Sequence, residues 1–269
     1  YFLQKHGSPG TIASSWKPET LSGQHLPFVC NLCGLCTKIC PPSVGLDPTA
    51  MFLEMRQQIV KSGAAPFPGH KRLLAYEGRG LSARYSCSVL PNHCDTVLFP
   101  GCGFAGTRPA RLLELFEHLR QNIPSLGIVL SCCAKPSHDL GQQDFFLNIF
   151  GKLRQFLVTQ GVQRVLVLCP SCHAIFKQYG FPLQTEYVYT LLTQHPLPKN
   201  YVLDDNKKIT IHDPCITRQD DEVHHSVRQL IQAASLEREE MPHHGSKTLC
   251  CGEGGAVPFI EKKNCPKMG

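Results

Sequence analysis

Residues 96–102 read TVLFPGC, a short apolar run that ends in proline, glycine and cysteine. The run predicts a buried β-strand that stops near Pro100 and places Cys102 just beyond its end. The same arrangement, an apolar run followed by cysteine, recurs in the segments 127–133 and 164–169. Three strands are therefore each expected to carry cysteine at the carboxyl end.

Helical patterns separate these three strands. Apolar residues recur at helical spacing over about residues 107–121 and again over roughly 143–160. Strands that alternate with helices of this length predict parallel βαβ units and an α/β fold. Because the carboxyl ends of parallel strands meet at one edge of the sheet, we expect the cysteines of the three loops in one pocket.

Composition narrows the class of protein. The chain has 269 residues, of which 42% are hydrophobic, enough for a buried core. Its net charge of +6 is spread along the sequence without a basic block, so we expect no nucleic-acid binding. We find no run of 18 apolar residues and no signal-peptide pattern in residues 1–10, so no membrane span is expected.

Fifteen cysteines dominate the chemistry. Their number is odd, and adjacent cysteines such as Cys132-Cys133 do not easily bridge to each other, so a disulfide framework is not expected. Closely spaced thiolates are instead ligands for iron–sulfur clusters. We therefore expect a redox protein of a reducing, cytoplasmic compartment.

The first cysteine group has the spacing C-x2-C-x2-C-x3-C-P, which is the bacterial ferredoxin run and predicts a [4Fe-4S] cluster. Its members are Cys30, Cys33, Cys36 and Cys40. Gly34 is expected where the backbone turns around the cluster. Because the run occurs once, the fourth ligand stays open between Cys40, Cys87, Cys94 and a residue outside this chain. The less favoured alternative is a structural zinc site.

The second group contains the cysteines that follow the predicted strands: Cys102, Cys132, Cys133, Cys169 and Cys172. The spacing of Cys102 from the adjacent pair is nearly repeated by Cys215 and Cys250-Cys251, which indicates an internal repeat. Continuing the repeat places its closing C-x-x-C beyond Gly269, so we expect a truncated chain. Cys265 lies too close to Cys251 to replace that motif and is expected to face solvent.

The segments FPGC, SCCAKP, CPSC, HDPC and LCCGEGG resemble the cysteine-rich CCG domain of the heterodisulfide reductase B/D family. That family includes the iron–sulfur subunits of glycolate, lactate and anaerobic glycerol-3-phosphate oxidation. The likeness covers roughly residues 28–260. It implies two Rossmann-like pseudo-repeats, each with a C…CC…CxxC pattern that can bind a non-cubane cluster.

Matched residue by residue, the five cysteines of the second group fill one complete pattern. Cys215, Cys250 and Cys251 fill the first three positions of the other. One departure stands out, because Ala134 replaces the glycine of the first CCG triplet. We expect this alanine to weaken the tight turn beside the pair.

The expected organisation has four parts. Residues 1–27 form an N-terminal arm, and residues 28–94 form a ferredoxin-like [4Fe-4S] domain with a connector. The first CCG pseudo-repeat covers 95–204, and an incomplete second one covers 205–269. Within the ferredoxin-like part, Asp47 is expected to cap a helix that carries an apolar stripe and stops at Gly63.

The resemblance implies an iron–sulfur oxidoreductase that passes electrons from the [4Fe-4S] cluster to a second cluster held by the CCG motif. The five cysteines of the second group would be catalytic and would serve the reduction of a disulfide-type substrate. Cys215, Cys250 and Cys251 would bind cofactor. Redox partner subunits, a flavoprotein or another iron–sulfur protein, are implied, with membrane association only through such a partner.

Two other functions stay open. The chain could be an electron-relay subunit of a flavin-dependent hydroxy-acid or glycerol-3-phosphate dehydrogenase that feeds quinone. It could also be a scaffold or sensor stabilised by zinc or a cluster. Gly252, Gly254 and Gly255 do not form a phosphate-binding loop, and their spacing favours close backbone approach to a cluster. The pairs His224-His225 and His243-His244 are expected at the surface.

Overall fold

The computed structural model describes residues 2–195 and 208–260. Cys265 and the end of the expected second pseudo-repeat therefore lie outside the described residues. The chain divides into two compact units, each made of segments that are separate in sequence. The first unit contains residues 1–77, 136–147 and 249–269, and the second contains 78–135 and 148–248.

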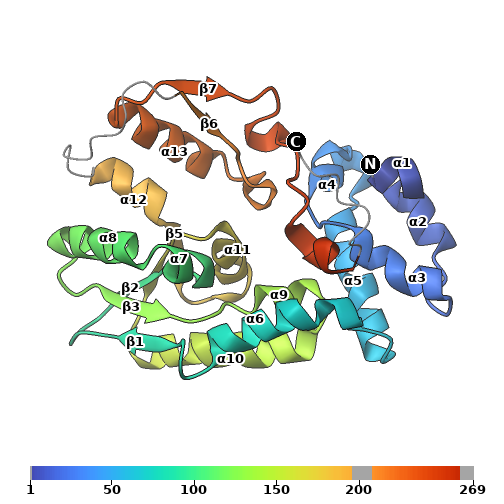
Figure 1. Cartoon of the computed structure of the whole chain (residues 1–269), viewed down its shortest axis with the longest axis horizontal. Coiled ribbons are helices and arrows are strands. Elements are labelled where there is room, and N and C mark those ends of the chain that lie inside the picture. The colour runs from blue at the N-terminus through green and yellow to red at the C-terminus, as the bar shows by residue number, and fades with distance from the viewer. Residues whose placement is uncertain (1, 196–207, 261–269) are drawn as a thin grey trace. The chain divides into compact units, whose positions relative to one another are not determined.

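Short helices build most of the first unit (Figure 1). Two of them begin at polar caps, because the hydroxyls of Ser8 and Thr20 accept hydrogen bonds from the backbone N–H groups of Thr11 and Gly23. The helices before the first cysteine group are α1 (Phe2–His6), α2 (Pro9–Ser15), α3 (Leu21–His25) and the 3-10 turn η1 (Leu26–Val29). The segment expected as an arm is thus largely helical.

Helix α5 (Pro48–Lys61) confirms the expected helix start. The Asp47 carboxylate accepts from the N–H groups of Thr49 and Ala50, and Pro48 occupies the first turn. The remaining elements associated with this unit are α4 (Leu35–Ile39), η2 (Pro42–Val44), η3 (Pro68–His70), α6 (Lys71–Leu81), α9 (Lys135–Asp139) and η6 (Gly254–Phe259).

The second unit contains a five-stranded sheet in the order β1-β3-β2-β4-β5. Its strands are β1 (Cys87–Val89), β2 (Thr96–Phe99), β3 (Gly127–Leu130), β4 (Arg164–Val167) and β5 (Gln184–Tyr187). Strands β2 to β5 pair in parallel, as expected, whereas β1 pairs with β3 in antiparallel register. The α/β class is therefore confirmed, and the sheet is mixed because of its edge strand.

Helices cover both faces of this sheet. Leu98 packs with Leu112 of α8 (Pro109–Asn122) and Leu191 of α12 (Val188–Gln194). The next residue of β2 points the other way, and Phe99 contacts Phe176 of α11 (Pro170–Tyr179), with ring centroids 5.0 Å apart. Figure 1 shows α8 and α12 on one side of the sheet and α10 (Gln143–Thr159) on the other.

A smaller βαβ unit follows in the same part of the chain. The strands β6 (Ile209–Ile211) and β7 (Arg238–Glu240) pair in parallel, with α13 (Asp221–Ala233) between them in sequence. Short turns surround it: α7 (Cys102–Thr107) precedes α8, η4 (Cys215–Thr217) follows β6, and η5 (Gly245–Lys247) follows β7. No described helix has both the length and the apolar character needed to cross a membrane.

Candidate metal centres

The five cysteines of the second group all lie in the second unit, in loops at the carboxyl ends of β2, β3 and β4. The Cys172 and Cys133 sulfur atoms are 3.4 Å apart. The thiols of Cys102 and Cys132 are hydrogen-bonded, as are those of Cys169 and Cys172. The shared sheet edge thus brings thiols from three loops into contact, as the strand pattern predicted.

Gly101 permits this gathering. It has φ +79° and ψ 155°, a backbone conformation that essentially only glycine adopts. A methyl group at this position would lie 2.8 Å from Cβ of Cys169 and 3.2 Å from the Cys172 sulfur. The loop after β2 can therefore lie against the loop after β4 only because residue 101 has no side chain.

The turn beside the adjacent pair is left-handed at its third residue. Ala134 has φ +56° and is fully buried. Gly252 occupies the equivalent position after Cys250-Cys251 and has φ +88°. The alanine thus adopts a conformation that costs an L-residue roughly 1–2 kcal/mol. This strain is the physical consequence of having Ala134 in place of the glycine of the CCG triplet.

The five thiols differ in acidity. A hydrogen bond from Cys172 and the N–H groups of Ser171 and Cys172, at the start of α11, together outweigh burial and lower the pKa of Cys169 to about 6. Hydrogen bonding to Cys102, together with burial, raises the pKa of Cys132 far above its ordinary value. Hydrogen bonds to Cys133 and Cys169, with burial, also raise the pKa of Cys172.

This donor set fits an iron–sulfur cluster, because soft thiolates are the ligands that such clusters require. Cys132, Cys133 and Cys172 are buried, which suits a site shielded from solvent. Among the described residues, no three Cys, His, Asp or Glu side chains surround a point as ligands of one metal ion would. Since Cys133 and Cys172 touch, their side chains must separate to admit a cluster.

The ferredoxin-type loop is in the first unit and wraps around a left-handed turn. Leu32 and Gly34 have φ +53° and +68°, and α4 begins directly after Gly34. Burial raises the pKa of Cys30 to about 11, and the nearby charges of Cys33 and Cys36 add to this. The three cysteines therefore lie close together around the turn where Gly34 was expected.

The fourth ligand of this loop remains open. Cys40 follows the last turn of α4, where its N–H donates to the Cys36 carbonyl at 2.9 Å. Cys87 and Cys94 belong to the other unit. Cys87 is exposed on β1, whereas Cys94 is buried and its thiol donates to the Thr96 carbonyl at 3.2 Å. Cys94 is thus already engaged in packing.

The loop after Cys250-Cys251 is bound to the ferredoxin-type loop within the first unit. The Asn31 amide donates to the carbonyls of Gly252 at 2.8 Å and Gly254 at 3.2 Å. A methyl group on Gly255 would lie 2.6 Å from the Cys30 carbonyl oxygen. Gly254 and Gly255 therefore serve a close backbone approach, and the partner is the loop that carries Cys30 and Asn31.

Arg56 is the residue at this junction that sequence reasoning missed. It is fully buried in α5 and makes five hydrogen bonds to backbone carbonyls. The carbonyls belong to Pro27, Cys30, Asp139 and Gly255. Arg56 lies between the buried positions Phe52 and Ile59 on one face of α5. Its position on the apolar face of this helix is the sequence signal that could have indicated its burial.

Cys215 lies at the start of η4 in the second unit, whereas Cys250 and Cys251 belong to the first. Just before Cys215, the buried carboxylate of Asp213 pairs with Arg228 at 2.8 Å. Arg228 also binds Glu240 on β7 at 2.8 Å. This ion-pair chain fixes the loop after β6 to α13 and β7.

Of the two histidine pairs expected at the surface, three members are exposed and one is not. His225, His243 and His244 are exposed. His224 is 7% exposed, and its Nε2 atom lies 3.0 Å from the Thr217 hydroxyl. The expectation was therefore wrong for His224, because α13 turns this residue towards η4.

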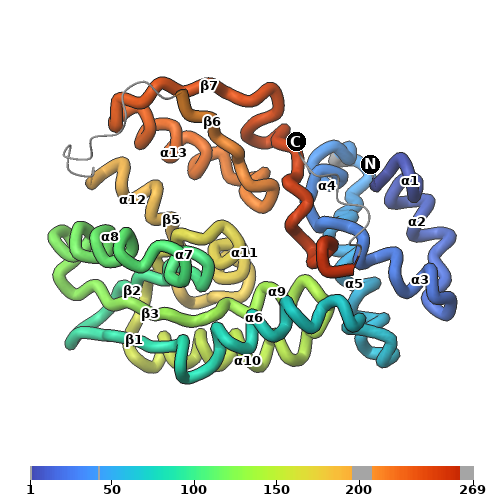
Figure 2. The backbone as a smooth tube through the Cα atoms, viewed as in Figure 1, coloured from blue at the N-terminus to red at the C-terminus, as the bar shows by residue number. Residues whose placement is uncertain are grey.

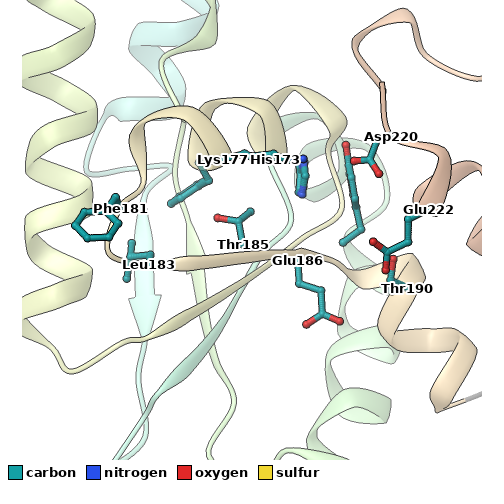
Figure 3. Close-up of a pocket in the computed structure, with 11 residues that line it drawn as sticks. His173, Lys177, Phe181, Leu183, Thr185, Glu186, Thr190, Asp220 and Glu222 are labelled. Carbon is teal, nitrogen blue, oxygen red and sulfur yellow. The ribbon is translucent and has the colours of Figure 1, made fainter. Parts of the chain in front are cut away.

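A pocket of about 310 Å³ lies beside α11 in the second unit (Figure 3). His173, the neighbour of Cys172, projects into it and stacks on Tyr187 with ring centroids 3.7 Å apart. Burial lowers the pKa of His173 to about 4, so its ring is neutral. The buried Thr185 hydroxyl has no hydrogen-bond partner among the described residues.

The polar ends of this pocket differ in charge. Lys177 lies on the side of Phe181, and Asp220 and Glu222 lie at the opposite end (Figure 3). Apolar walls, a neutral ring and a hydroxyl without a partner are features of sites that bind small organic molecules. No residue of this pocket was singled out from the sequence, because its lining comes from scattered positions without a motif.

The names of three known proteins that are similar to this chain describe redox proteins. It is 22% identical to an EtfAB:quinone oxidoreductase of Syntrophomonas wolfei, in an alignment that covers 92% of this chain and 39% of the relative. It is 23% identical to a polypeptide of the dihydromethanophenazine:CoB–CoM heterodisulfide reductase of Methanosarcina mazei, covering 85% of this chain and 62% of that one. A probable membrane-anchored ferredoxin of Chromohalobacter salexigens is 21% identical over 89% of this chain and 40% of its own length.

The chain thus spans between about two fifths and three fifths of these relatives. No solved structure matches it significantly. The family model of the CCG cysteine-rich domain matches residues 96–177 and 209–265, together more than half of the chain. These segments contain all five cysteines of the second group, and also Cys215, Cys250 and Cys251. The chain belongs to the family of CCG cysteine-rich domain proteins.

Proposed function

We propose that this chain is an iron–sulfur electron-transfer subunit with at least two clusters. One is a [4Fe-4S] cluster held by Cys30, Cys33 and Cys36, with Cys40 as the first choice for the fourth ligand. The other is held by Cys102, Cys132, Cys133, Cys169 and Cys172. The single observation that carries the proposal is that thiols from three loops meet in pairs at one sheet edge: Cys102 with Cys132, Cys133 with Cys172, and Cys172 with Cys169.

We further propose the domain organisation that the resemblance implies. The ferredoxin-like part covers 28–94, and the two Rossmann-like pseudo-repeats cover 95–204 and 205–269. The two segments matched by the family model fall inside these two ranges. On this proposal, Cys215, Cys250 and Cys251 are ligands of the second pseudo-repeat.

The reaction proposed at the five-cysteine site is the reduction of a small disulfide, which consumes two electrons and two protons and yields two thiols. A cluster at this site would supply the electrons. The chain's own residues bind and orient the substrate, and the pocket beside α11 is the candidate binding place because it shares that helix with Cys172. The name of the heterodisulfide reductase relative supports this chemistry.

A second function, electron relay without a substrate, is supported by the names of the other two relatives. In that case the chain would take electrons from a flavoprotein partner and deliver them towards quinone. Both versions need partner subunits, and membrane association would come through such a partner.

Turnover of a small disulfide separates the two versions. The chain, purified without oxygen and loaded with clusters, is mixed with reduced viologen and a disulfide, and thiol release is measured. Release that disappears in Cys132→Ser supports disulfide reduction. A loaded protein that reduces no disulfide, but co-purifies with a flavoprotein whose activity is lost in Cys132→Ser, supports relay. A colourless protein that contains zinc contradicts both.

A further inference from the structure

Arg56 places a positive charge against the backbone of the ferredoxin-type loop without exposure to solvent. Its Nη2 atom donates to the Cys30 carbonyl, and its guanidinium lies over the Phe28 ring at 5.1 Å. In such a site the field of the charge is poorly screened, so it acts on neighbouring groups more strongly than a surface charge does.

The groups around Arg56 neutralise its positive charge only in part. All five hydrogen bonds of Arg56 go to carbonyl oxygens, which are dipoles and not anions. The carboxylate of Asp139 attracts the Arg56 charge, and that carboxylate also accepts from His138 at 3.0 Å. A positive field therefore remains at the loop.

The same side chain joins two cysteine motifs. Arg56 donates to the Cys30 carbonyl and to the Gly255 carbonyl in the loop that follows Cys250-Cys251. In Figure 2, the blue N-terminal and red C-terminal segments of the first unit lie side by side at this junction. Removal of the guanidinium would leave the carbonyls of both loops without their shared donor.

We infer that Arg56 is a positioning residue whose buried charge raises the reduction potential of the cluster at Cys30, Cys33 and Cys36. The inference rests on the proposed function, because it requires that cluster. Reduction adds a negative charge to the cluster, and a nearby fixed positive charge stabilises the reduced form more than the oxidised one. Net charge around a cluster is one of the terms that set its potential.

The test is an EPR-monitored redox titration of the full chain, purified without oxygen. Arg56→Gln is expected to make the equilibrium constant for reduction at least tenfold less favourable, a downward shift of 59 mV or more for a one-electron couple. Arg56→Lys keeps the charge and is expected to stay within threefold of the wild type. Gln57→Ala, the neighbouring position on α5, is the matched control and should leave the potential unchanged.

A second variant, which is expected to shift the reduction potential in the opposite direction, tests the inference if Arg56→Gln does not fold. Asp139→Asn removes the negative charge near Arg56 and is expected to make reduction at least threefold more favourable. A loaded Arg56→Gln protein with the wild-type potential overturns the inference, as does an unshifted Asp139→Asn protein. A chain that takes up no cluster overturns the inference together with the proposed function, whereas an unshifted potential leaves the proposed function intact.

Discussion

The sulfur atoms of Cys133 and Cys172 are 3.4 Å apart, although the two residues are separated by 39 positions in the sequence. They meet because β3 and β4 both pair in parallel with β2 and end at the same edge of the sheet. The sheet therefore acts as a scaffold on which three loops present thiols towards one another.

Gly101→Ala should disrupt the site where the loops after β2 and β4 touch. The added methyl group would lie 2.8 Å from Cβ of Cys169, in a backbone conformation that alanine rarely adopts. We expect a loss of about 2–3 kcal/mol in the free energy of unfolding. Urea denaturation of the purified variant measures it.

Gly103→Ala is the matched control for this substitution. Gly103 lies in α7, and a methyl group there meets no atom within 4 Å. Its stability should stay within about 1 kcal/mol of the wild type. Equal losses at both positions would contradict the role given to Gly101.

Ala134→Gly should be nearly neutral. Glycine relieves the cost of the left-handed conformation, about 1 kcal/mol, but removes a fully buried methyl group worth about the same. We expect the free energy of unfolding, measured by urea denaturation, to change by less than about 0.5 kcal/mol. Ala174→Gly, within α11, should cost about 1 kcal/mol. A comparable loss in both variants would show that the turn at Ala134 is not strained.

His70 should make the first unit sensitive to mild acid. Burial, followed by the charges of Arg56 and His25, lowers the pKa of His70 to about 4 from an ordinary 6.5. At pH 5.5 the unfolded chain binds a proton that the folded chain does not, so stability falls as the pH drops below 6.5. Between pH 7.5 and 5.5, this effect of His70 should lower the free energy of unfolding by about 1.4 kcal/mol.

His70→Asn isolates this contribution. The asparagine carbonyl can replace the Nδ1 atom that accepts from the Phe67 N–H at 3.2 Å, but it does not titrate. Stability measured by urea denaturation at both pH values should therefore fall less in the variant than in the wild type. Identical losses in the two proteins would show that the pKa of His70 is not lowered in the folded chain.

The sheet and its cysteine edge follow from local sequence because their signals are strong. The runs at β2, β3 and β4 are apolar and short, and each is followed by a cysteine. The Asp47-Pro48 start of α5 is equally local. Such patterns fix the end of an element and the direction in which the chain leaves it, and with them the position of the thiols.

Other elements carried no comparable signal. Helix α6 and strand β1 lie in residues 64–94, the glycine-, proline- and arginine-rich part of the 28–94 segment that is expected to form the connector. All three residues of strand β1 are exposed, and the strand gains its pairing from β3, so its structure depends on tertiary contact.

Arg56 and His224 show a second kind of limit. Both are polar residues on helices and were not expected in the interior, yet both are buried. Each is accommodated by partners distant in sequence or on another element: Arg56 by carbonyls of three segments, and His224 by Thr217. Partners of this kind are visible only once the chain has folded.

The central claim, that thiols from three loops hold one cluster, is tested most directly by iron and sulfide analysis of Cys133→Ser. Cys94→Ser is the control, because the Cys94 thiol is buried but bonded to the Thr96 carbonyl. We predict that Cys133→Ser loses iron and sulfide and one EPR signal while the ferredoxin-type signal persists, and that Cys94→Ser loses neither. Full iron, sulfide and EPR signals in Cys133→Ser would contradict the account.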